Sequence, residues 1–328
     1  MSTPRHRYAA RYAFALIIAL IAAAPTARAD YTFTNFSVPG ASRTSIAGIS
    51  GSSIFGGYTD VNSVNHGFIM TNGQLTTLDA PQAGAGSNQG TGVGGISGNA
   101  IVGTYTDANN VKHGFIDSAG VYSTYDAPGA GQAAGDGTAL YAVDGQNIVG
   151  AGYNGASTFG FLYNGSQFTS ISDPNALAGS WATGISGTTV VGTYVGPFNS
   201  YHAFVFDGST YTTINGPYLG SVGPVDGTVL QAMDGVKLVG TVLNTSVNGE
   251  PFAHGFIYDG STFNIVSYPS AYGTFLTGAS GNTVVGYYFP SPNSVSQSFI
   301  ATSPEPTAAG VLLFGGSLLA LRRRKICR

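Results

Sequence analysis

The sequence predicts an all-β protein: a six-bladed β-propeller of four-stranded repeats, each about 46 residues long. A tetrapeptide recurs six times, and short stretches of alternating apolar and polar residues recur with it. The composition agrees, with 49 Gly, 19 Tyr, 19 Phe and only 8% charged residues. Gly with aromatic and β-branched residues favours short strands joined by tight turns, whereas disorder needs high charge and few aromatics.

The recurring tetrapeptide marks one strand of each repeat. Its six copies start 47, 47, 42, 48 and 46 residues apart. An apolar pair and a glycine follow each copy, as in Val190-Val191-Gly192. The copies are Gly48-Ile49-Ser50-Gly51, Gly95-Ile96-Ser97-Gly98, Ala142-Val143-Asp144-Gly145, Gly184-Ile185-Ser186-Gly187, Ala232-Met233-Asp234-Gly235 and Gly278-Ala279-Ser280-Gly281.

Two further elements complete each unit. After the tetrapeptide and the apolar pair, a third element is a His-Gly-Phe type triplet, as in His66-Gly67-Phe68. In the fourth element, apolar and polar residues alternate up to a proline, as in residues 75–81. Alternation closed by turn residues indicates a strand. Four short strands in 42 to 48 residues are typical of a propeller blade.

The two ends of the body complement each other. The sixth unit stops after Phe299-Ile300-Ala301 without a fourth strand, whereas residues 31–39 form a fourth-strand pattern with no unit before it. We therefore expect the N-terminal strand to complete the last blade and remove an open edge. An open β-solenoid is the alternative.

The N-terminus has the pattern of a secretory signal peptide over residues 1–29. Arg5, Arg7 and Arg11 precede an apolar run over 13–24, and Ala27-Arg28-Ala29 provides a small-residue cleavage site before Asp30. A membrane helix is the alternative, although this run is short for a bilayer of about 30 Å. The propeller body then covers residues 30–302.

Residues 303–328 have the pattern of a sorting tail. Pro304, Glu305 and Pro306 precede an apolar run over 307–321, and a basic cluster ends the chain. Fifteen helical residues span only about 22 Å, which suits a transient anchor better than a permanent one. The basic cluster should remain cytoplasmic; it contains Arg322, Arg323, Arg324 and Lys325.

This tail resembles the PEP-CTERM sorting signal of Gram-negative bacteria, whose pattern is Pro-Glu-Pro, a short apolar helix and an Arg cluster. The resemblance implies recognition by an exosortase-type enzyme, transient membrane anchoring and export to the cell surface or extracellular matrix. An ordinary tail anchor is the alternative. The body resembles the HAF repeats of bacterial extracellular proteins, named for the triplet that stands here as His202-Ala203-Phe204. That resemblance implies a repeat protein and supplies no catalytic residue.

The charge distribution limits the classes of partner. Residues 30–302 contain three basic and fourteen acidic residues, a formal charge of −11. A surface this acidic disfavours nucleic acid, because binding requires Lys and Arg to neutralise phosphates. Cys327 is the only cysteine, so no intrachain disulfide can form.

Four residues are candidates for a ligand-binding mouth. Asp144 and Asp234 replace serine in two tetrapeptides, and Trp181 and Tyr141 stand shortly before two others. The aspartates could be acidic groups near the propeller axis or polar strand ends. The aromatic residues could stack against sugar rings or belong to the core.

The other polar motifs favour structural roles. Four histidines recur at one position of different units, where we expect each to open the third strand and bond within its own blade. Asp60-Val61-Asn62 and Asp107-Ala108-Asn109 predict turns. Weak Ca²⁺ binding in an acidic shell is the alternative, but the remaining ligands of an EF-hand are missing. We expect no other metal and no cofactor.

Two classes of function remain open. The favoured one is an exported, non-enzymatic surface or matrix protein that interacts with exopolysaccharide or other matrix components. The alternative is an extracellular propeller hydrolase or lyase that acts on glycans, using Asp residues at the mouth. No nucleophile elbow, catalytic cysteine or phosphate-binding loop is present in the sequence.

Overall fold

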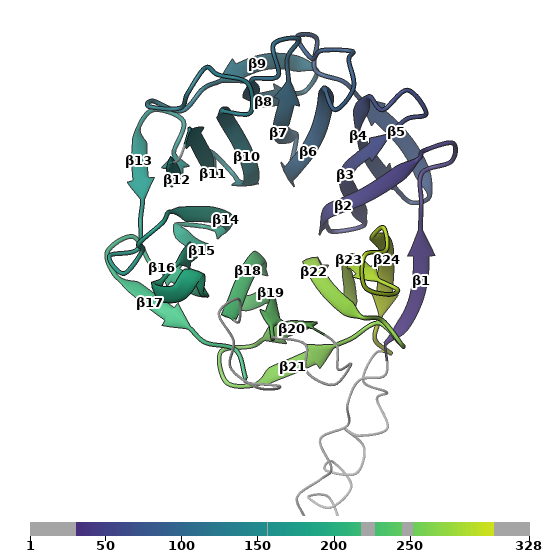
Figure 1. Cartoon of the computed structure of the whole chain (residues 1–328), viewed down its shortest axis with the longest axis vertical. Coiled ribbons are helices and arrows are strands. Elements are labelled where there is room, and N and C mark those ends of the chain that lie inside the picture. The colour runs from purple at the N-terminus through teal and green to yellow at the C-terminus, as the bar shows by residue number, and fades with distance from the viewer. Residues whose placement is uncertain (1–30, 156, 218–226, 245–251, 305–328) are drawn as a thin grey trace, which may run out of the picture.

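The computed structural model describes residues 31–155, 157–217, 227–244 and 252–304. Their strands fall into six antiparallel groups of four, and Figure 1 shows the groups arranged around a ring. Short parallel bridges, such as Asn65 opposite Gly90, join neighbouring groups into two 12-stranded sheets. The all-β, propeller-like architecture that the repeats predict is confirmed.

The strand bounds follow the repeat. The inner strands are β2 (Arg43–Ser50), β6 (Gly90–Ser97), β10 (Gly137–Asp144), β14 (Ser180–Ser186), β18 (Gly227–Asp234) and β22 (Gly273–Ser280). The second strands are β3 (Ser53–Thr59), β7 (Ala100–Thr106), β11 (Asn147–Asn154), β15 (Thr189–Val195), β19 (Lys237–Leu243) and β23 (Thr283–Phe289). The third strands are β4 (Asn65–Thr71), β8 (Lys112–Ser118), β12 (Ser157–Tyr163), β16 (Tyr201–Phe206), β20 (Ala253–Tyr258) and β24 (Gln297–Thr302). The fourth strands are β5 (Gln74–Leu78), β9 (Val121–Tyr125), β13 (Phe168–Ile171), β17 (Tyr211–Ile214), β21 (Phe263–Val266) and, in the last group, β1 (Thr32–Phe36).

Within the described ranges, the helical structure is limited to the 3-10 turn η1 (Pro197–Asn199). No helix in these ranges has the length and apolar character needed to cross a membrane. The expected signal peptide (1–29) and the tail from Glu305 onward lie outside the described residues.

The phenylalanine of the third-strand triplet forms the core of each group. Its six copies are at most 1% exposed: Phe68, Phe115, Phe161, Phe204, Phe256 and Phe299. Burying such a side chain contributes about 1.5–3 kcal/mol. The repeated glycine of the second strand makes room for this ring. A Cβ at Gly192 would lie 2.0 Å from the Trp181 carbonyl oxygen and 2.5 Å from Cζ of Phe204.

Hydrogen bonds of one kind join the six groups. After each fourth strand, the backbone N–H of the residue before proline donates to a hydroxyl at the start of the next inner strand; we call these the latch bonds. They join Ala80 to Thr91 (2.9 Å), Ala127 to Thr138 (2.8 Å), Asp173 to Ser180 (3.3 Å), Gly216 to Thr228 (2.8 Å), Tyr268 to Thr274 (2.9 Å) and Val38 to Thr44 (2.9 Å).

The N-terminal strand lies beside the last third strand. β1 pairs antiparallel with β24, from Thr32 opposite Thr302 to Phe36 opposite Ser298. The Ser298 hydroxyl in turn donates to the Thr44 carbonyl oxygen at 3.0 Å, so β24 is also bonded to β2. Strands from the two ends of the described chain therefore meet in one four-stranded group (Figure 1).

Candidate functional site

Every inner strand has a β-bulge, which leaves one of its residues out of the regular pairing with the second strand. In β10, for example, the register with β11 shifts between Leu140 and Ala142, which leaves Tyr141 unpaired. A bulge bends the strand and re-aims the extra residue. The six bulge residues are Ala47, Gly94, Tyr141, Thr183, Gln231 and Thr277.

These six bulge residues line two adjoining hollows at the centre of the ring. One hollow, of about 410 Å³, is lined by the bulge residues and by residues nearer the beginnings of the inner strands; we call it the aromatic chamber. The other, of about 330 Å³, is lined by the bulge residues and the tetrapeptides; we call it the aspartate chamber. Because the two chambers share these lining residues, they adjoin, and we call them together the axial channel.

The aromatic chamber combines flat rings with neutral polar groups. Tyr141 from β10, Trp181 from β14 and Tyr201 from the start of β16 supply the rings. Gln231 and Thr277 are among the residues that supply amide and hydroxyl groups. The described residues that line this chamber include no charged side chain.

The Tyr141 ring is held in place by its hydroxyl group. That hydroxyl hydrogen-bonds the hydroxyl of Tyr153 on β11, and Nζ of Lys112 lies 4.5 Å from the centre of the Tyr153 ring. Burial raises the pKa of Tyr141 well above its ordinary value, and the neighbouring Tyr153 raises it further. Tyr141 therefore presents a neutral phenol to the chamber at physiological pH.

Trp181 and Thr183 lie on β14, which is hydrogen-bonded to the next group. The Thr183 hydroxyl donates to the Leu230 carbonyl oxygen at 2.7 Å. On β15, the Thr193 hydroxyl accepts a hydrogen bond from the Leu230 N–H at 3.2 Å. These bonds connect β14 and β15 to β18, so the backbone that carries Trp181 is fixed.

The aspartate chamber contains both predicted acidic residues. Oδ2 of Asp144 accepts a hydrogen bond from the Gly187 N–H at 2.6 Å, and Oδ2 of Asp234 accepts one from the Gly281 N–H at 3.3 Å. Each carboxylate thus bonds the tetrapeptide turn of the next group. Both residues line the chamber, but β14 lies between their inner strands in the ring.

The aspartate chamber and its surroundings offer no evident metal site. Among the described residues, no group of three or more His, Cys, Asp or Glu side chains is arranged to hold a metal ion. The two aspartates therefore act here as polar groups of the channel wall and as hydrogen-bond acceptors between groups.

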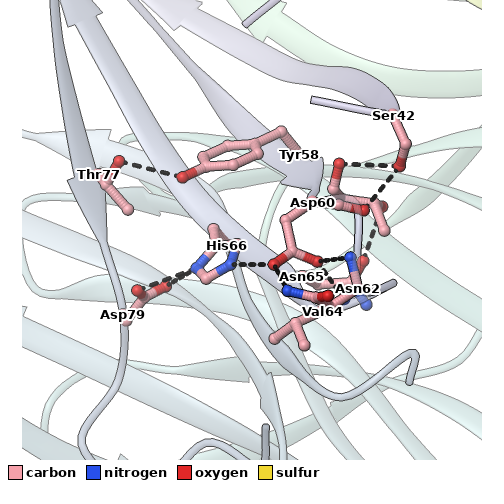
Figure 2. A network of polar contacts seen from close by, with 10 residues as sticks. Ser42, Tyr58, Asp60, Asn62, Val64, Asn65, His66, Thr77 and Asp79 are labelled. Carbon is pink, nitrogen blue, oxygen red and sulfur yellow. Dashed lines mark hydrogen bonds and ion pairs between the residues drawn. The ribbon is translucent and has the colours of Figure 1, made fainter. Parts of the chain in front are cut away.

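The recurring histidines line neither chamber. Figure 2 shows the polar contacts of His66. Nδ1 of His66 lies 3.0 Å from both carboxylate oxygens of Asp79, and Nε2 lies 3.8 Å from Oδ2 of Asp60. The ring stacks on Tyr58 with centroids 5.0 Å apart. The predicted contact within the same group is therefore confirmed for His66.

The same geometry recurs in part elsewhere. His113 repeats it with Asp126, Asp107 and Tyr105. In the fourth group, Nε2 of His202 instead lies 2.8 Å from the Ser200 hydroxyl. Asn215 stands there where the first two groups have aspartate.

The turn prediction for Asp60 is confirmed. Its Oδ1 accepts hydrogen bonds from the N–H groups of Val64 at 2.8 Å and Asn62 at 2.9 Å (Figure 2). The bond from Val64 lowers the pKa of Asp60; burial opposes this, while Asn62 and the His66 charge lower it further. Asp107 makes the corresponding bonds to Asn109 and Val111.

The structure places the sequence candidates in two regions. Tyr141 and Trp181 line the aromatic chamber, and Asp144 and Asp234 line the aspartate chamber. Tyr141 lines both chambers. Of the sorting motif, Pro304 is exposed, whereas Glu305, Pro306, Arg322, Arg323 and Arg324 lie outside the described residues.

Tyr201 and the bulge residues Gln231 and Thr277 were not predicted from the sequence as site residues. A usable signal was present, because each bulge residue stands immediately before its tetrapeptide.

Comparison with known proteins gives only remote likenesses. No protein-family profile matches the chain, and no curated protein matches it. The β-propeller domain of the Trilobed protease from Pyrococcus furiosus has 10% identity and a TM-score of 0.44, over 77% of this chain and 91% of that one. A six-bladed fungal lectin from Aleuria aurantia has 13% identity and a TM-score of 0.43, over 85% and 97%. TolB from Acinetobacter baumannii has 11% identity and a TM-score of 0.44, over 77% and 64%. Function must therefore be argued from the channel itself.

Proposed function

We propose that this protein is an exported, non-enzymatic binding protein whose axial channel holds a glycan of the cell surface or extracellular matrix. The observation that carries the proposal is the aromatic chamber. Tyr141, Trp181 and Tyr201 offer flat apolar faces beside neutral hydrogen-bonding groups. A sugar ring has the complementary surface, with C–H groups on its faces and hydroxyl groups around its edge. A volume of about 410 Å³ is within the range of small-ligand sites.

The ring itself is inferred to be a six-bladed propeller closed by β1. The pairing of β1 with β24 and the latch bond from Val38 to Thr44 support this closure. A closed ring keeps all six inner strands around one channel and leaves no long open sheet edge. An open β-solenoid would not place the first and last groups side by side.

Export and sorting complete the proposal. The signal pattern over residues 1–29 and the Pro-Glu-Pro tail support passage through the inner membrane, followed by processing by an exosortase-type enzyme. The acidic body, with a formal charge of −11 over residues 30–302, supports a partner other than nucleic acid.

A glycan-array screen of the purified protein tests the proposal. We expect retention of one or a few related glycans, without turnover, at salt concentrations that screen surface charge. Binding to no glycan on an array that includes bacterial exopolysaccharide fragments would refute the binding role.

A second candidate is a glycan hydrolase or lyase, because Asp144 and Asp234 line the same chamber. Each carboxylate already accepts an N–H from the next group, which favours a structural role. Release of shorter products by the native protein, but not by the Asp144→Asn and Asp234→Asn variants, would establish the enzyme instead.

A further inference from the structure

We propose that the aromatic chamber is a single site for one neutral sugar ring, stacked on Trp181 and bordered by Tyr141 and Tyr201. This inference rests on the proposed glycan-binding function and adds the position, stoichiometry and charge class of the ligand. It follows from an asymmetry: the backbone repeats six times around the channel, but the side chains that face the chamber do not.

The aromatic rings are confined to neighbouring groups. Tyr141 belongs to the third group, and Trp181 and Tyr201 belong to the fourth. At the inner-strand position of Trp181, the other groups have Ser45, Gly92, Ala139, Val229 and Phe275. Phe275 stacks on Tyr287 with centroids 4.8 Å apart and does not line the chamber.

The opposite wall has small side chains. The first two groups place Ala47 and Gly94 at the bulge, and the exposed Ser45 also lines the chamber. A ring lying against Trp181 would therefore have space on its other side. Because the aromatic platform occurs once among the described residues, the chain should bind one ligand, although it contains six repeats.

The platform is organised before any ligand arrives. The Tyr141 hydroxyl is bonded to Tyr153, and Thr183 and Thr193 tie the Trp181 wall to Leu230. Fixed side chains lose less conformational entropy on binding, so such a wall favours affinity. Gln231 offers both an amide donor and a carbonyl acceptor to ligand hydroxyl groups.

The charge of the channel selects against acidic sugars. No charged side chain lines the aromatic chamber among the described residues, whereas Asp144 and Asp234 line the adjoining chamber. A uronate entering the channel would lose hydration without gaining a cationic partner. The acidic body would also repel it at long range. Neutral oligosaccharides should therefore bind more tightly than uronates of the same length.

The test uses the only tryptophan of the chain as a probe of the chamber. The purified full chain is titrated with neutral tetrasaccharides (cellotetraose, maltotetraose and the neutral glycans retained on the array) and with tetragalacturonate. Tryptophan emission and calorimetry are followed in parallel. We expect one bound neutral ligand per chain, a change in Trp181 emission at saturation, and affinity for tetragalacturonate at least about tenfold weaker.

Variants distinguish the loss of a ligand contact at Trp181 from a loss of folding. Trp181→Ala should weaken binding about tenfold or more. Trp181→Tyr should retain most of the affinity, because it keeps a stacking face. Leu177→Ala is the control, since Leu177 is 71% exposed and does not line the chamber. Unfolding midpoints of all three variants establish that each is folded before its affinity is compared.

The outcomes distinguish this inference from the broader function. Neutral-glycan binding that leaves Trp181 emission unchanged and survives Trp181→Ala would overturn the site but keep the glycan-binding function. Several equivalent ligands per chain, or tighter binding of tetragalacturonate, would overturn the single neutral site. Binding of no glycan in any assay would overturn both.

Discussion

The backbone N–H of Val38 donates a hydrogen bond to the Thr44 hydroxyl over 2.9 Å, and this bond joins the segment after β1 to β2. The other five junctions between groups have the same bond, from the residue before proline to a Thr or Ser. The junction between the group that contains β1 and the group that contains β2 is therefore built like the other five junctions. The proposed closure of the ring can therefore be tested at the Thr44 hydroxyl group.

Replacing Thr44 with valine should weaken that junction. The substitution keeps the shape but removes the acceptor, which leaves the buried Val38 N–H unpaired and lowers the free energy of unfolding by about 1–3 kcal/mol. Urea denaturation measures the change. Thr34→Val is the matched control, because Thr34 is exposed on β1 and its replacement should alter stability by less than about 0.5 kcal/mol. Equal effects of the two substitutions would contradict a role for the latch bond in closure.

Two neighbouring glycines of β3 should respond differently to alanine. A Cβ at Gly56 would lie 2.1 Å from the Ser45 carbonyl oxygen, whereas at Gly57 the nearest atom would be 3.5 Å away. Gly56→Ala must therefore displace the inner strand and should destabilise the protein by about 1–3 kcal/mol or more. Gly57→Ala should be nearly neutral. Thermal unfolding of the pair checks this, and similar midpoints would show that β3 does not pack against β2 as described.

Alkaline pH should destabilise the fold through its partly buried tyrosines. Burial, aided by the neighbouring Tyr163, raises the pKa of Tyr125 to about 12, above the value of about 10 for an unfolded chain. The stabilisation is complete below pH 10 and is lost as the pH rises toward 12. Urea denaturation at several alkaline pH values should show this loss, and Tyr125→Phe should reduce its slope. A stability that stays constant from pH 9 to 12 would contradict the burial of Tyr125.

Acid should weaken the turn at Asp60. Hydrogen bonds from Val64 and Asn62 lower the pKa of Asp60, so the contribution of its carboxylate is present above about pH 4 and lost as the pH falls through the lower folded value. Asp60→Asn retains a carbonyl acceptor but cannot titrate. We therefore expect the variant to lose less stability than the native protein between pH 6 and pH 3. If the unfolding free energies of the native protein and the variant changed in parallel with pH, the Asp60 carboxylate would make no contribution to stability.

The repeats alone predicted much of the fold. Apolar alternation located the strands, and the missing fourth strand of the last unit indicated where residues 31–39 belong. The repeated Phe, as in Phe204, also proved to be the core side chain. These predictions succeed because strand pairing and burial depend on local patterns that the chain repeats.

The channel was less predictable. Whether Tyr141 and Trp181 share a chamber depends on a one-residue bulge in each inner strand, and a shift of one residue turns a side chain to the other face of a sheet. The hydrogen bond from the Gly187 N–H to the Asp144 carboxylate likewise spans two groups, so neither local sequence could indicate it. The sequence therefore suggested the candidate residues but not their neighbours.

Protection of a cysteine inside the channel from labelling shows directly whether a glycan occupies the aromatic chamber. Ser45 is exposed and lines the aromatic chamber, whereas Val61 is 81% exposed on the loop between β3 and β4 and lines neither chamber. Each is replaced by cysteine in a chain with the Cys327→Ser substitution, and maleimide labelling is followed with and without a saturating array-identified glycan. The channel site predicts that the glycan slows labelling of Ser45→Cys several-fold and leaves Val61→Cys unchanged. Unchanged labelling of Ser45→Cys while the glycan is bound would show that the ligand lies elsewhere.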